Sequence, residues 1–365
     1  MMPVPKTSNP SSVGNMLRSM RKASFAALKS CGISAAVAGS QWRQRQLLIL
    51  CYHGISVEDE HEWLPRTYML ASALRSRFQL LRDAGCSVLP LGEALQRLYA
   101  GDLPPKSVAI TFDDGGFDFY RSAYPVVREC GFPVTVYQTT YYSDFPKPIF
   151  NLASSYMLWK CRDKVFPAQP DLGITHPMDL RAPNGRQSAL NQLITATEKK
   201  GVSGEGKDEL AQKLAQHLGF DYAAFYAKRL IQLMTPEEIA ELSAKGIDFQ
   251  LHTHRHRTPE DEELFRKEIR DNRKRLQEIT GQDARHFCYP SGVYKMQNLS
   301  WLAQEGVASA TTCEPYLASN ASKALLLPRL VDTTFKSAIE FEAWLSGLGS
   351  LFARKPASAS LNHRG

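Results

Sequence analysis

The 365-residue chain lacks the features of a disulfide scaffold and of a membrane-spanning protein. Its seven cysteines are an odd number and include no CxxC pair, which argues against a disulfide framework. Cys51, Cys86 and Cys288 fall inside apolar strand-like runs, where we expect buried free thiols. No apolar run approaches the roughly 20 residues that a membrane-spanning helix needs.

A secretory leader is poorly supported. Residues 23–39, ASFAALKSCGISAAVAG, are rich in small apolar side chains and contain an A-x-A-like AVA. However, Lys29 interrupts them, and a long Pro/Ser-rich lead precedes them. An amphipathic helix lying on a surface fits this segment better than a signal peptide does. We therefore expect a cytoplasmic or peripheral membrane location rather than a secreted one, with the side of any membrane left open.

Positive charge is in modest excess, with a net charge of +7 that is concentrated at the two ends of the chain. The residues concerned are Lys6, Arg18, Arg21, Lys22, Lys29, Arg43 and Arg45 near the start, and Arg354, Lys355 and Arg364 in the tail. Such ends fit weak attraction to anionic lipid or to an acidic polymer, and a solvated flank is the alternative. We read residues 1–45 as a basic N-terminal segment. We expect no nucleic-acid partner, and no protein partner can be inferred.

Short apolar runs alternate with amphipathic stretches from about residue 46 to about residue 345. Hydrophobic residues make up 43% of the chain, which is ample for a large core. The predicted strands lie in LLILCYHG (47–54), CSVLP (86–90), SVAITFDDGG (107–116), PVTVYQT (133–139), GIDFQLH (246–252), RHFCYP (285–290) and GVASATT (306–312). About seven such strand–helix units predict parallel strands, joined by right-handed crossovers, that close into a barrel.

The second half of the sequence contains clear signals for the ends of helices. TPEE (235–238) predicts a capping box at the start of a helix that ends at Gly246. TPED (258–261) predicts the start of the next helix, with Gly281 beyond its end. The residues expected on the inner side of that helix are Leu264, Ile269, Leu276 and Ile279.

Residues 145–234 interrupt the alternation. The stretch is predominantly helical in pattern, with Leu210, Leu214 and Leu218 on one face of ELAQKLAQHLG, and its joints are polar and contain glycine. We predict a helical insertion between the fourth and fifth units, placed where it can cover the barrel mouth. Residues 346–365 are predicted to form a flexible tail.

Polar groups follow several predicted strands at the point where each strand ends. They are His53 after the first strand, Asp113 and Asp114 after the third, His252 and His256 after the fifth, and Pro290–Gly292 after the sixth. In a parallel barrel, functional side chains gather at the C-terminal ends of the strands. We therefore expect these groups to converge on one rim.

The stretch TFDDG places two carboxylates side by side. Both can reach the same site only if the chain turns after them, and Gly115 and Gly116 permit that turn. A cation bound to one carboxylate would relieve the repulsion and leave the other ionised as a base. An Asx-turn with a helix N-cap is the alternative reading of this stretch.

The stretch FQLHTHRHRTP holds three of the nine histidines at alternate positions. With one aspartate, His252 and His256 make an N/N/O set that suits zinc and leaves a coordination position for water. Such a site performs hydrolysis. His254 lies between them and is an alternative ligand that the spacing does not exclude, and a solvated loop is the alternative to a metal site.

TFDDG, HTHRH in the form H-[ST]-x-x-H, and YPSG together resemble the polysaccharide deacetylases of carbohydrate esterase family 4, the NodB-homology domain. YHGIS, AYPVV, FPVTVY and LPRL support the resemblance, which covers roughly residues 47–345 and is closest to the exopolysaccharide-cluster type. It implies a distorted (β/α)7 barrel of parallel strands with a helical insertion. It also implies metal-dependent hydrolysis of an N-acetyl group, less often an O-acetyl group, on an acetylated polysaccharide or its precursor.

The resemblance assigns roles to individual residues. It implies that Asp113 is the general base and that Asp114, His252 and His256 hold a divalent metal, with Zn²⁺ preferred. It implies that the backbone N–H of Ser291 contributes to binding the developing oxyanion, which agrees with the electrostatics of such a step. Aromatic residues near the strand ends, Tyr289 among them, are candidates for stacking on a sugar, and ordinary packing at the rim is the alternative.

Two departures from the family pattern matter. Many members have an arginine that orients the base at the position of Cys288, and we hypothesise that Arg329 of LPRL replaces it at the substrate site; a surface ion pair is the alternative. Many members also carry a late L-x-H histidine as the general acid, but the only LNH here lies at 361–363 in the tail. We predict that His53 of YHGIS is the acid instead, with a hydrogen bond to a neighbouring loop as the alternative.

Three functions compete on this evidence. The leading one is a metal-dependent deacetylase of a polysaccharide. The second is a non-catalytic, metal-containing carbohydrate-binding barrel, against which the intact Asp113 argues, because binding alone does not need an unligated carboxylate. The third is a membrane-surface scaffold that uses residues 1–45, and it leaves the rim groups as coincidence.

Overall fold

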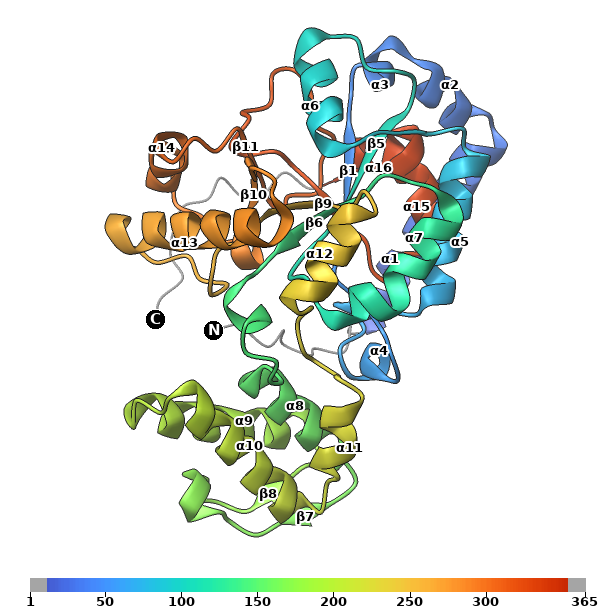
Figure 1. The fold of residues 1–365 in the computed structure, drawn as a ribbon. Helices are drawn as coiled ribbons and strands as arrows, with labels where there is room; N and C mark the ends of the chain where they lie inside the picture. Colours follow the sequence, from blue (N-terminus) through green and yellow to red (C-terminus); the bar gives the residue numbers. More distant parts are fainter. Residues whose placement is uncertain (1–11, 354–365) are drawn as a thin grey trace.

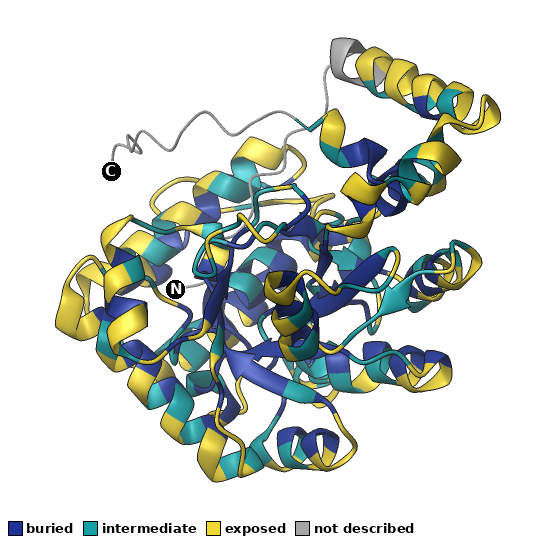
Figure 2. Ribbon diagram, turned by 90° about the horizontal axis from the view of Figure 1, so that it is seen from above, coloured by how far each residue is buried: buried dark blue, intermediate teal, exposed yellow. Residues whose placement is uncertain are grey.

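The protein is described by a computed structural model that covers residues 12–353. Its centre is a parallel sheet, built from strands that are almost wholly buried (Figures 1 and 2). The strands are β1 (Leu48–Tyr52), β4 (Ser87–Val88), β5 (Ser107–Phe112), β6 (Thr135–Gln138), β9 (Asp248–Leu251), β10 (His286–Cys288), β11 (Ser309–Thr311) and β12 (Leu330–Val331). Runs such as LILCY are apolar throughout because helices or barrel interior cover both faces of the sheet.

The sheet has the order β11-β10-β9-β6-β5-β1-β12, and β4 pairs with the beginning of β5. A parallel bridge between Thr311 and Leu327 joins β11 to the segment that leads into β12, and β12 pairs with β1. The sheet therefore curls back on itself, and the predicted distorted barrel is confirmed. One departure is that LPRL adds the short strand β12, so the main sheet has eight strands.

Helices cover the outside of the barrel and turn their apolar faces toward it (Figure 2). They are α5 (Ala71–Asp83), α6 (Leu91–Ala100), α7 (Tyr124–Cys130), α12 (Pro236–Ala244), α13 (Glu262–Thr280), α14 (Gln297–Gln304), α15 (Ala338–Ser346) and α16 (Leu348–Leu351). The capping box predicted at Thr235 is present, because Thr235 and Glu238 exchange hydrogen bonds at the start of α12.

The start of α13 differs from the prediction. The helix begins at Glu262, because Asp261, rather than Thr258, accepts a hydrogen bond from the backbone N–H of Leu264 at 2.9 Å. Leu264 is 56% exposed, so its predicted place on the inner side is wrong. Phe265, Ile269 and Leu276 form that side, and residues 252–261 remain an irregular loop.

Residues 145–234 form a lobe below the barrel in Figure 1. The lobe contains α8 (Phe150–Lys160), α9 (Pro183–Lys199), α10 (Gly204–Leu218) and α11 (Tyr222–Ala227), with a small antiparallel pair, β7 (Val165–Phe166) and β8 (Met178–Asp179). It has a hydrophobic cluster of its own, to which Leu214 and Leu218 belong, while Leu210 packs at its edge.

The N-terminal segment is helical and packs on the side of the barrel. Its helices are α1 (Ser12–Ser30), α2 (Ile33–Gly39) and α3 (Gln41–Gln44), and Phe25 of α1 is buried against Ala343 and Leu348. None of the described helices combines the length and the apolar character needed to cross a bilayer. Because α16 lies at 348–351 and buries Leu348, the predicted flexible tail does not begin at residue 346, and residues 354–365 lie outside the described chain.

We predict that Leu214→Ala loosens the insertion without loosening the barrel. Deleting this fully buried side chain should cost the lobe about 2–5 kcal/mol, because a cavity replaces its packing. Hydrogen exchange followed by mass spectrometry should show faster exchange in 150–227 and unchanged exchange in the barrel strands. Leu264→Ala at an exposed position is the matched control, and equal acceleration in the barrel would show that the lobe has no separate stability.

Candidate active site

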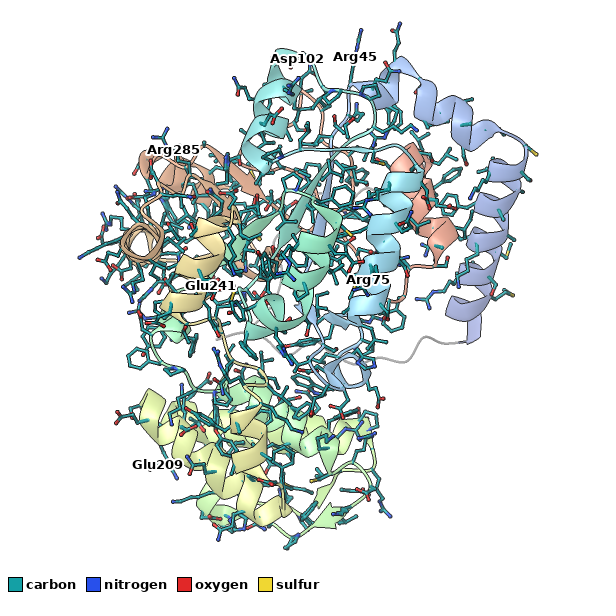
Figure 3. The ribbon with its side chains drawn as sticks, turned by 45° about the vertical axis from the view of Figure 1, so that its right-hand side comes forward. Arg45, Arg75, Asp102, Glu209, Glu241 and Arg285 are labelled. Carbon is teal, nitrogen blue, oxygen red and sulfur yellow. The ribbon has the colours of Figure 1, made fainter. Side chains whose placement is uncertain are left out.

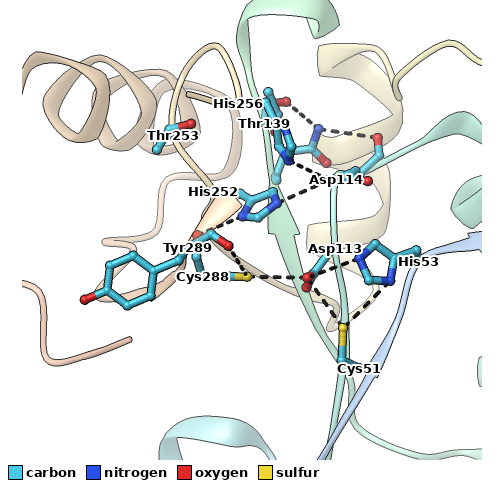
Figure 4. A network of polar contacts seen from close by, with 12 residues as sticks. Cys51, His53, Asp113, Asp114, Thr139, His252, Thr253, His256, Cys288 and Tyr289 are labelled. Carbon is cyan, nitrogen blue, oxygen red and sulfur yellow. Dashed lines mark hydrogen bonds and ion pairs between the residues drawn. The ribbon is translucent and has the colours of Figure 1, made fainter. Parts of the chain in front are cut away.

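Asp114, His252 and His256 meet at the C-terminal ends of β5 and β9 (Figure 4). The Nε2 atoms of both histidines lie 3.2 Å from Oδ1 of Asp114. His252 and His256 are buried, whereas the Asp114 side chain keeps 28% of its surface exposed. The three predicted metal ligands are therefore brought together, with one side open to solvent.

Hydrogen bonds fix the orientation of His252. Its Nδ1 lies 2.9 Å from the carbonyl oxygen of Cys288, which can only accept, so Nδ1 carries a proton and Nε2 is the nitrogen that faces Asp114. The backbone N–H of His252 donates to the side-chain oxygen of Asn272, and the side-chain nitrogen of Asn272 donates to the Gln138 carbonyl and to Thr140 Oγ1. A fully buried amide on α13 thus anchors the ligand loop to the end of β6.

The electrostatics of this group suit a cation. Burial opposes the charged form of Asp114, but the hydrogen bonds from His252 and His256 outweigh it and hold the pKa of Asp114 well below its ordinary value. Burial lowers the pKa of His256, which favours the neutral imidazole that a metal requires. Two imidazoles and one carboxylate form the N/N/O donor set that suits zinc, so the described residues fit a divalent metal.

Asp113 is held apart from the ligand group by a different set of contacts. Arg329 donates from Nη1 to Oδ1 and from Nη2 to Oδ2, both at 2.7 Å, and both side chains are buried. Burial alone would raise the pKa of Asp113, but the guanidinium of Arg329 prevails and holds that pKa below its ordinary value. Asp113 is consequently a buried carboxylate that stays ionised.

The predicted orienting contact of Arg329 is present in the structure, and the surface ion pair considered as its alternative is wrong. Arg329 is fully buried and also donates to the Thr312 carbonyl and to Thr111 Oγ1, each at 3.0 Å. A side chain with no exposed surface touches the base rather than a substrate, so the predicted substrate contact of Arg329 is not available.

Two thiols complete the surroundings of Asp113, and no sequence pattern predicted their position there. Cys288 and Cys51 donate to Oδ2 of Asp113 at 3.3 and 3.5 Å (Figure 4). Cys288 also accepts from Nη2 of Arg329 at 2.9 Å. Both residues were predicted as buried thiols, and both are buried and free. The only signal for more was that the resemblance implies an arginine at the position of Cys288.

His53 lies on the open side of the same cluster. Its Nε2 is 3.7 Å from Oδ2 of Asp113 and its Nδ1 is 3.8 Å from the Cys51 sulfur (Figure 4). The side chain is 25% exposed, so an imidazole at the end of β1 borders both the base and solvent.

The remaining residues predicted for the site have different positions in the structure. His254 turns away from Asp114, and its Nδ1 lies 2.8 Å from Thr140 Oγ1, so His256 rather than His254 joins the ligand group. Tyr289 is fully buried and its hydroxyl donates to the Leu325 carbonyl, so its side chain cannot stack on a sugar. Ser291 is exposed in the turn after β10 with φ 57°. The LNH at 361–363 lies outside the described residues.

Unusual backbone geometry gathers in the same motifs. Seven described residues other than glycine have positive φ, and four of them are Asp114, Thr253, His256 and Ser291. This conformation is costly for residues with a Cβ and persists where surrounding contacts impose it, commonly at functional sites. These four residues lie in TFDDG, HTHRH and YPSG. Their strained backbone is consistent with a functional site, in which the directions of the side chains are kept at a cost in local stability.

The insertion borders this site directly. A cavity of about 30 Å³ is lined by His53, Asp113 and Asp114 from the barrel and by Ile149, Leu152, Ile231 and Leu233 from the two ends of the insertion. The exit of the insertion is also hydrogen-bonded to the DDGG turn, from Phe117 N to the Gln232 carbonyl at 2.8 Å and from Met234 N to the Gly115 carbonyl at 3.0 Å. The predicted proximity of the insertion to the mouth is present in the structure.

Asp118 is a further acidic group on this cavity that the sequence did not single out. Its Oδ2 accepts from the backbone N–H of Ile55 at 2.6 Å, and burial raises the pKa of Asp118 to about 7. It follows the turn at Asp114 and Gly115 and the bridge at Gly116, and no sequence pattern pointed to it.

Comparison with known proteins agrees with this geometry. The family model described as polysaccharide deacetylase matches residues 208–310, which include the histidine loop and YPSG. The poly-beta-1,6-N-acetyl-D-glucosamine N-deacetylase of Escherichia coli (strain K12) is 30% identical over 98 residues. That alignment covers 27% of this chain and 14% of the relative, so the chain aligns with about a seventh of the length of the curated relatives it matches.

Solved structures extend the likeness to the whole barrel. The Streptococcus pyogenes deacetylase PplD, solved in complex with acetate, superposes with a TM-score of 0.54 at 19% identity, covering 83% of this chain and 97% of the other. IcaB from Ammonifex degensii superposes with a TM-score of 0.50 at 18% identity, covering 82% and 97%. The match to the polysaccharide deacetylase model thus covers residues 208–310, and the solved structures show that the barrel fold is shared over most of the chain.

Proposed function

We propose that the protein is a metal-dependent hydrolase that removes N-acetyl groups from a polysaccharide or its precursor. The observation that carries the proposal is the separation of two adjacent carboxylates. Asp114 faces two imidazole nitrogens at 3.2 Å, whereas Asp113 is held by Arg329 at 2.7 Å. A binding protein needs the first arrangement alone, but hydrolysis needs both.

Asp114, His252 and His256 would hold the divalent metal, for which Zn²⁺ is our first choice. When bound, such an ion polarises the acetyl carbonyl and makes water more acidic. The orientation of His252 by the Cys288 carbonyl, and of its loop by Asn272, keeps the donor atoms convergent.

Asp113 would accept the proton of the attacking water. The buried guanidinium of Arg329 keeps this carboxylate ionised and fixes its plane, which presents a base in a defined direction. His53, partly exposed and 3.7 Å from Asp113, would donate a proton to the leaving nitrogen as the C–N bond breaks. The products are acetate and the free amine, and the exposed turn at Ser291 would supply a backbone N–H to the oxyanion.

The first substrate to test follows from the relatives. The E. coli relative is named for action on poly-β-1,6-N-acetyl-D-glucosamine, and we propose that polymer, or oligosaccharides of it, as the substrate class. O-acetylated sugars are the second choice, because the same set of groups can hydrolyse an ester.

We predict that the two aspartates have separable roles. Asp114→Asn should lose bound metal and activity together, because it removes the charge shared by both imidazoles. Asp113→Asn should keep metal while acetate release falls by about 10²–10⁴-fold, the usual effect of losing a general base. Metal content of the purified protein and acetate release give the two readouts.

His254→Ala is the control for the metal measurement, because His254 does not face Asp114. Loss of metal from Asp113→Asn would reassign that residue as a ligand. A wild-type protein that holds metal but releases no acetate from N- or O-acetylated glycans would favour the non-catalytic carbohydrate-binding barrel.

We predict that Arg329→Ala destabilises the fold, because it leaves the Asp113 charge buried without its partner. The expected cost is about 3–5 kcal/mol, and Asp113→Asn in the same chain should recover a large part of it. Chemical denaturation of the two single variants and the double variant measures the coupling. Additive effects would mean that the ion pair does not account for the stability that is lost.

His53→Ala should lower acetate release by about 10²–10⁴-fold on an N-acetyl substrate while leaving metal content and stability unchanged. The loss should be smaller on an activated ester, because a good leaving group needs no proton. His61→Ala, which removes a nearby histidine bonded to Ser56, is the matched control. Full turnover of His53→Ala on the amide would exclude His53 as the acid.

A further inference from the structure

Three metal-ligating side chains meet at the end of β1, beside the Asp114 group. They are Cys51, His53 and Asp113, and one ligand atom of each lies within 4.8 Å of the other two. The Cys51 sulfur is 3.5 Å from Oδ2 of Asp113 and 3.8 Å from Nδ1 of His53 (Figure 4). Nε2 of His53 is 3.7 Å from the same Oδ2. The group therefore offers one sulfur, one nitrogen and one oxygen to a common centre.

The separations between these atoms match the edges of a tetrahedral metal site. Bonds of about 2.0–2.3 Å from an ion to sulfur, nitrogen and oxygen place the ligand atoms roughly 3.3–3.8 Å from one another. The polar contacts of the His53 ring within the described chain, at 3.7 and 3.8 Å, are long, so the ring can turn to present one nitrogen. An ion can thus bind without a shift of the strands.

Asp113 also forms a group with His252 and Cys288, but that group suits an ion less well. Nη2 of Arg329 lies 2.9 Å from the Cys288 sulfur, which sets a cation against it. The two nitrogens of His252 already face the Cys288 carbonyl and the ligand group described above. No cation donates a hydrogen bond to the sulfur of Cys51 within the described residues, so Cys51 is the better soft ligand.

The group lies at the end of the barrel that faces the insertion. Arg45 and Asp102 precede β1 and β5, and Figure 3 shows both at the end of the barrel away from the lobe in which Glu209 is labelled. Both strands therefore run toward the lobe, and the residues at their ends border its cavity.

This cavity gives an ion a route to the group. Cys51 is fully buried, but His53 is 25% exposed and lines the cavity of about 30 Å³ together with Asp113. A space of that size holds about one water or ion. An ion from solvent can consequently pass the imidazole and meet the sulfur behind it, with the cavity side left for a water ligand.

We infer that Cys51, His53 and Asp113 form a second metal site, which binds a thiophilic divalent ion such as Zn²⁺ or Cd²⁺ once the Asp114 site is filled. A thiolate ligand selects soft ions over Mg²⁺ and Ca²⁺. Binding breaks the S–H bond of Cys51 and forms a sulfur–metal bond, and the proton passes to solvent. The thiolate and the Asp113 carboxylate together offset the two charges of the ion.

The second ion would regulate the proposed function, and this effect depends on that function. It would occupy Asp113, the proposed base, and His53, the proposed acid, at the same time. Excess Zn²⁺ should therefore inhibit acetate release, whereas the same concentration of Mg²⁺ should not. Binding itself does not require that the protein hydrolyse anything, so the two proposals can fail separately.

The test is a titration of the full chain with Cd²⁺ after the Asp114 site has been filled with Zn²⁺. Equilibrium dialysis should show uptake of a second ion, and a thiolate-to-cadmium charge-transfer band should appear in the ultraviolet. Cd²⁺ that merely replaces the ion at Asp114 gives no such band, because that group contains no sulfur. Cys51→Ser should weaken uptake of the second ion at least about tenfold, since a hydroxyl keeps the contact with Asp113 but is a poor ligand for a soft ion.

Cys31→Ser and Cys288→Ser are the controls, because Cys31 is exposed and Cys288 lies on the other side of Asp113. Both should take up the second ion as the wild type does. Retention of the ion at Asp114 shows that each variant is folded at the site. In the activity assay, each variant is compared with its own rate without excess metal, and Cys51→Ser should raise the inhibitory Zn²⁺ concentration at least about tenfold.

The inference is overturned if the wild type binds no second ion, or if Cys51→Ser binds it equally well. It is also overturned if Cys288→Ser rather than Cys51→Ser abolishes uptake, or if the second ion binds without inhibiting an active enzyme. A protein that binds the second ion through Cys51 but releases no acetate would support the second metal site and contradict the proposed function alone.

Discussion

The site depends on one buried ion pair, between Asp113 at the end of β5 and Arg329 at the start of β12. These two strands lie on either side of β1 in the sheet order, so the pair spans β1 and ties neighbouring parts of the barrel together. Two charges with no exposed surface are costly unless each satisfies the other, and the bidentate geometry at 2.7 Å does so. Because Arg329 neutralises Asp113, the adjacent Asp114 can carry its own charge toward the two imidazoles.

Much of this arrangement could be predicted from the chain because it depends on local patterns. Apolar runs ending in TFDDG and in HTHRH placed carboxylates and imidazoles at strand ends, and parallel topology brought them to one rim. Spacing alone did not decide between His254 and His256, because the choice depends on the positive φ of Thr253 and His256; the resemblance to the family motif implied His256. The helix at 348–351 was missed for a similar reason, since it depends on packing against α1, far away in sequence.

The contacts of two thiols with Asp113 could not be predicted from the sequence. Cys51 and Cys288 are separated by more than two hundred residues and look like ordinary core residues, yet both contact the same carboxylate oxygen. The curvature of the sheet brings Cys51 of β1 and Cys288 of β10 to the same carboxylate. The prediction that Tyr289 stacks on a sugar is wrong for a similar reason. An aromatic residue next to a motif can pack beneath the site instead of facing the substrate, and the side chain of Tyr289 is fully buried.

The hydrogen bonds between the insertion and the DDGG turn connect the exit of the lobe to the backbone beside Asp114. The segment 232–234 is paired with Gly115–Phe117, immediately after Asp114, so the lobe cannot tilt without pulling on the backbone that positions this carboxylate. A displacement of the lobe would thus reach Asp114 through main-chain hydrogen bonds. The position of the insertion and the direction of the Asp114 carboxylate are therefore coupled.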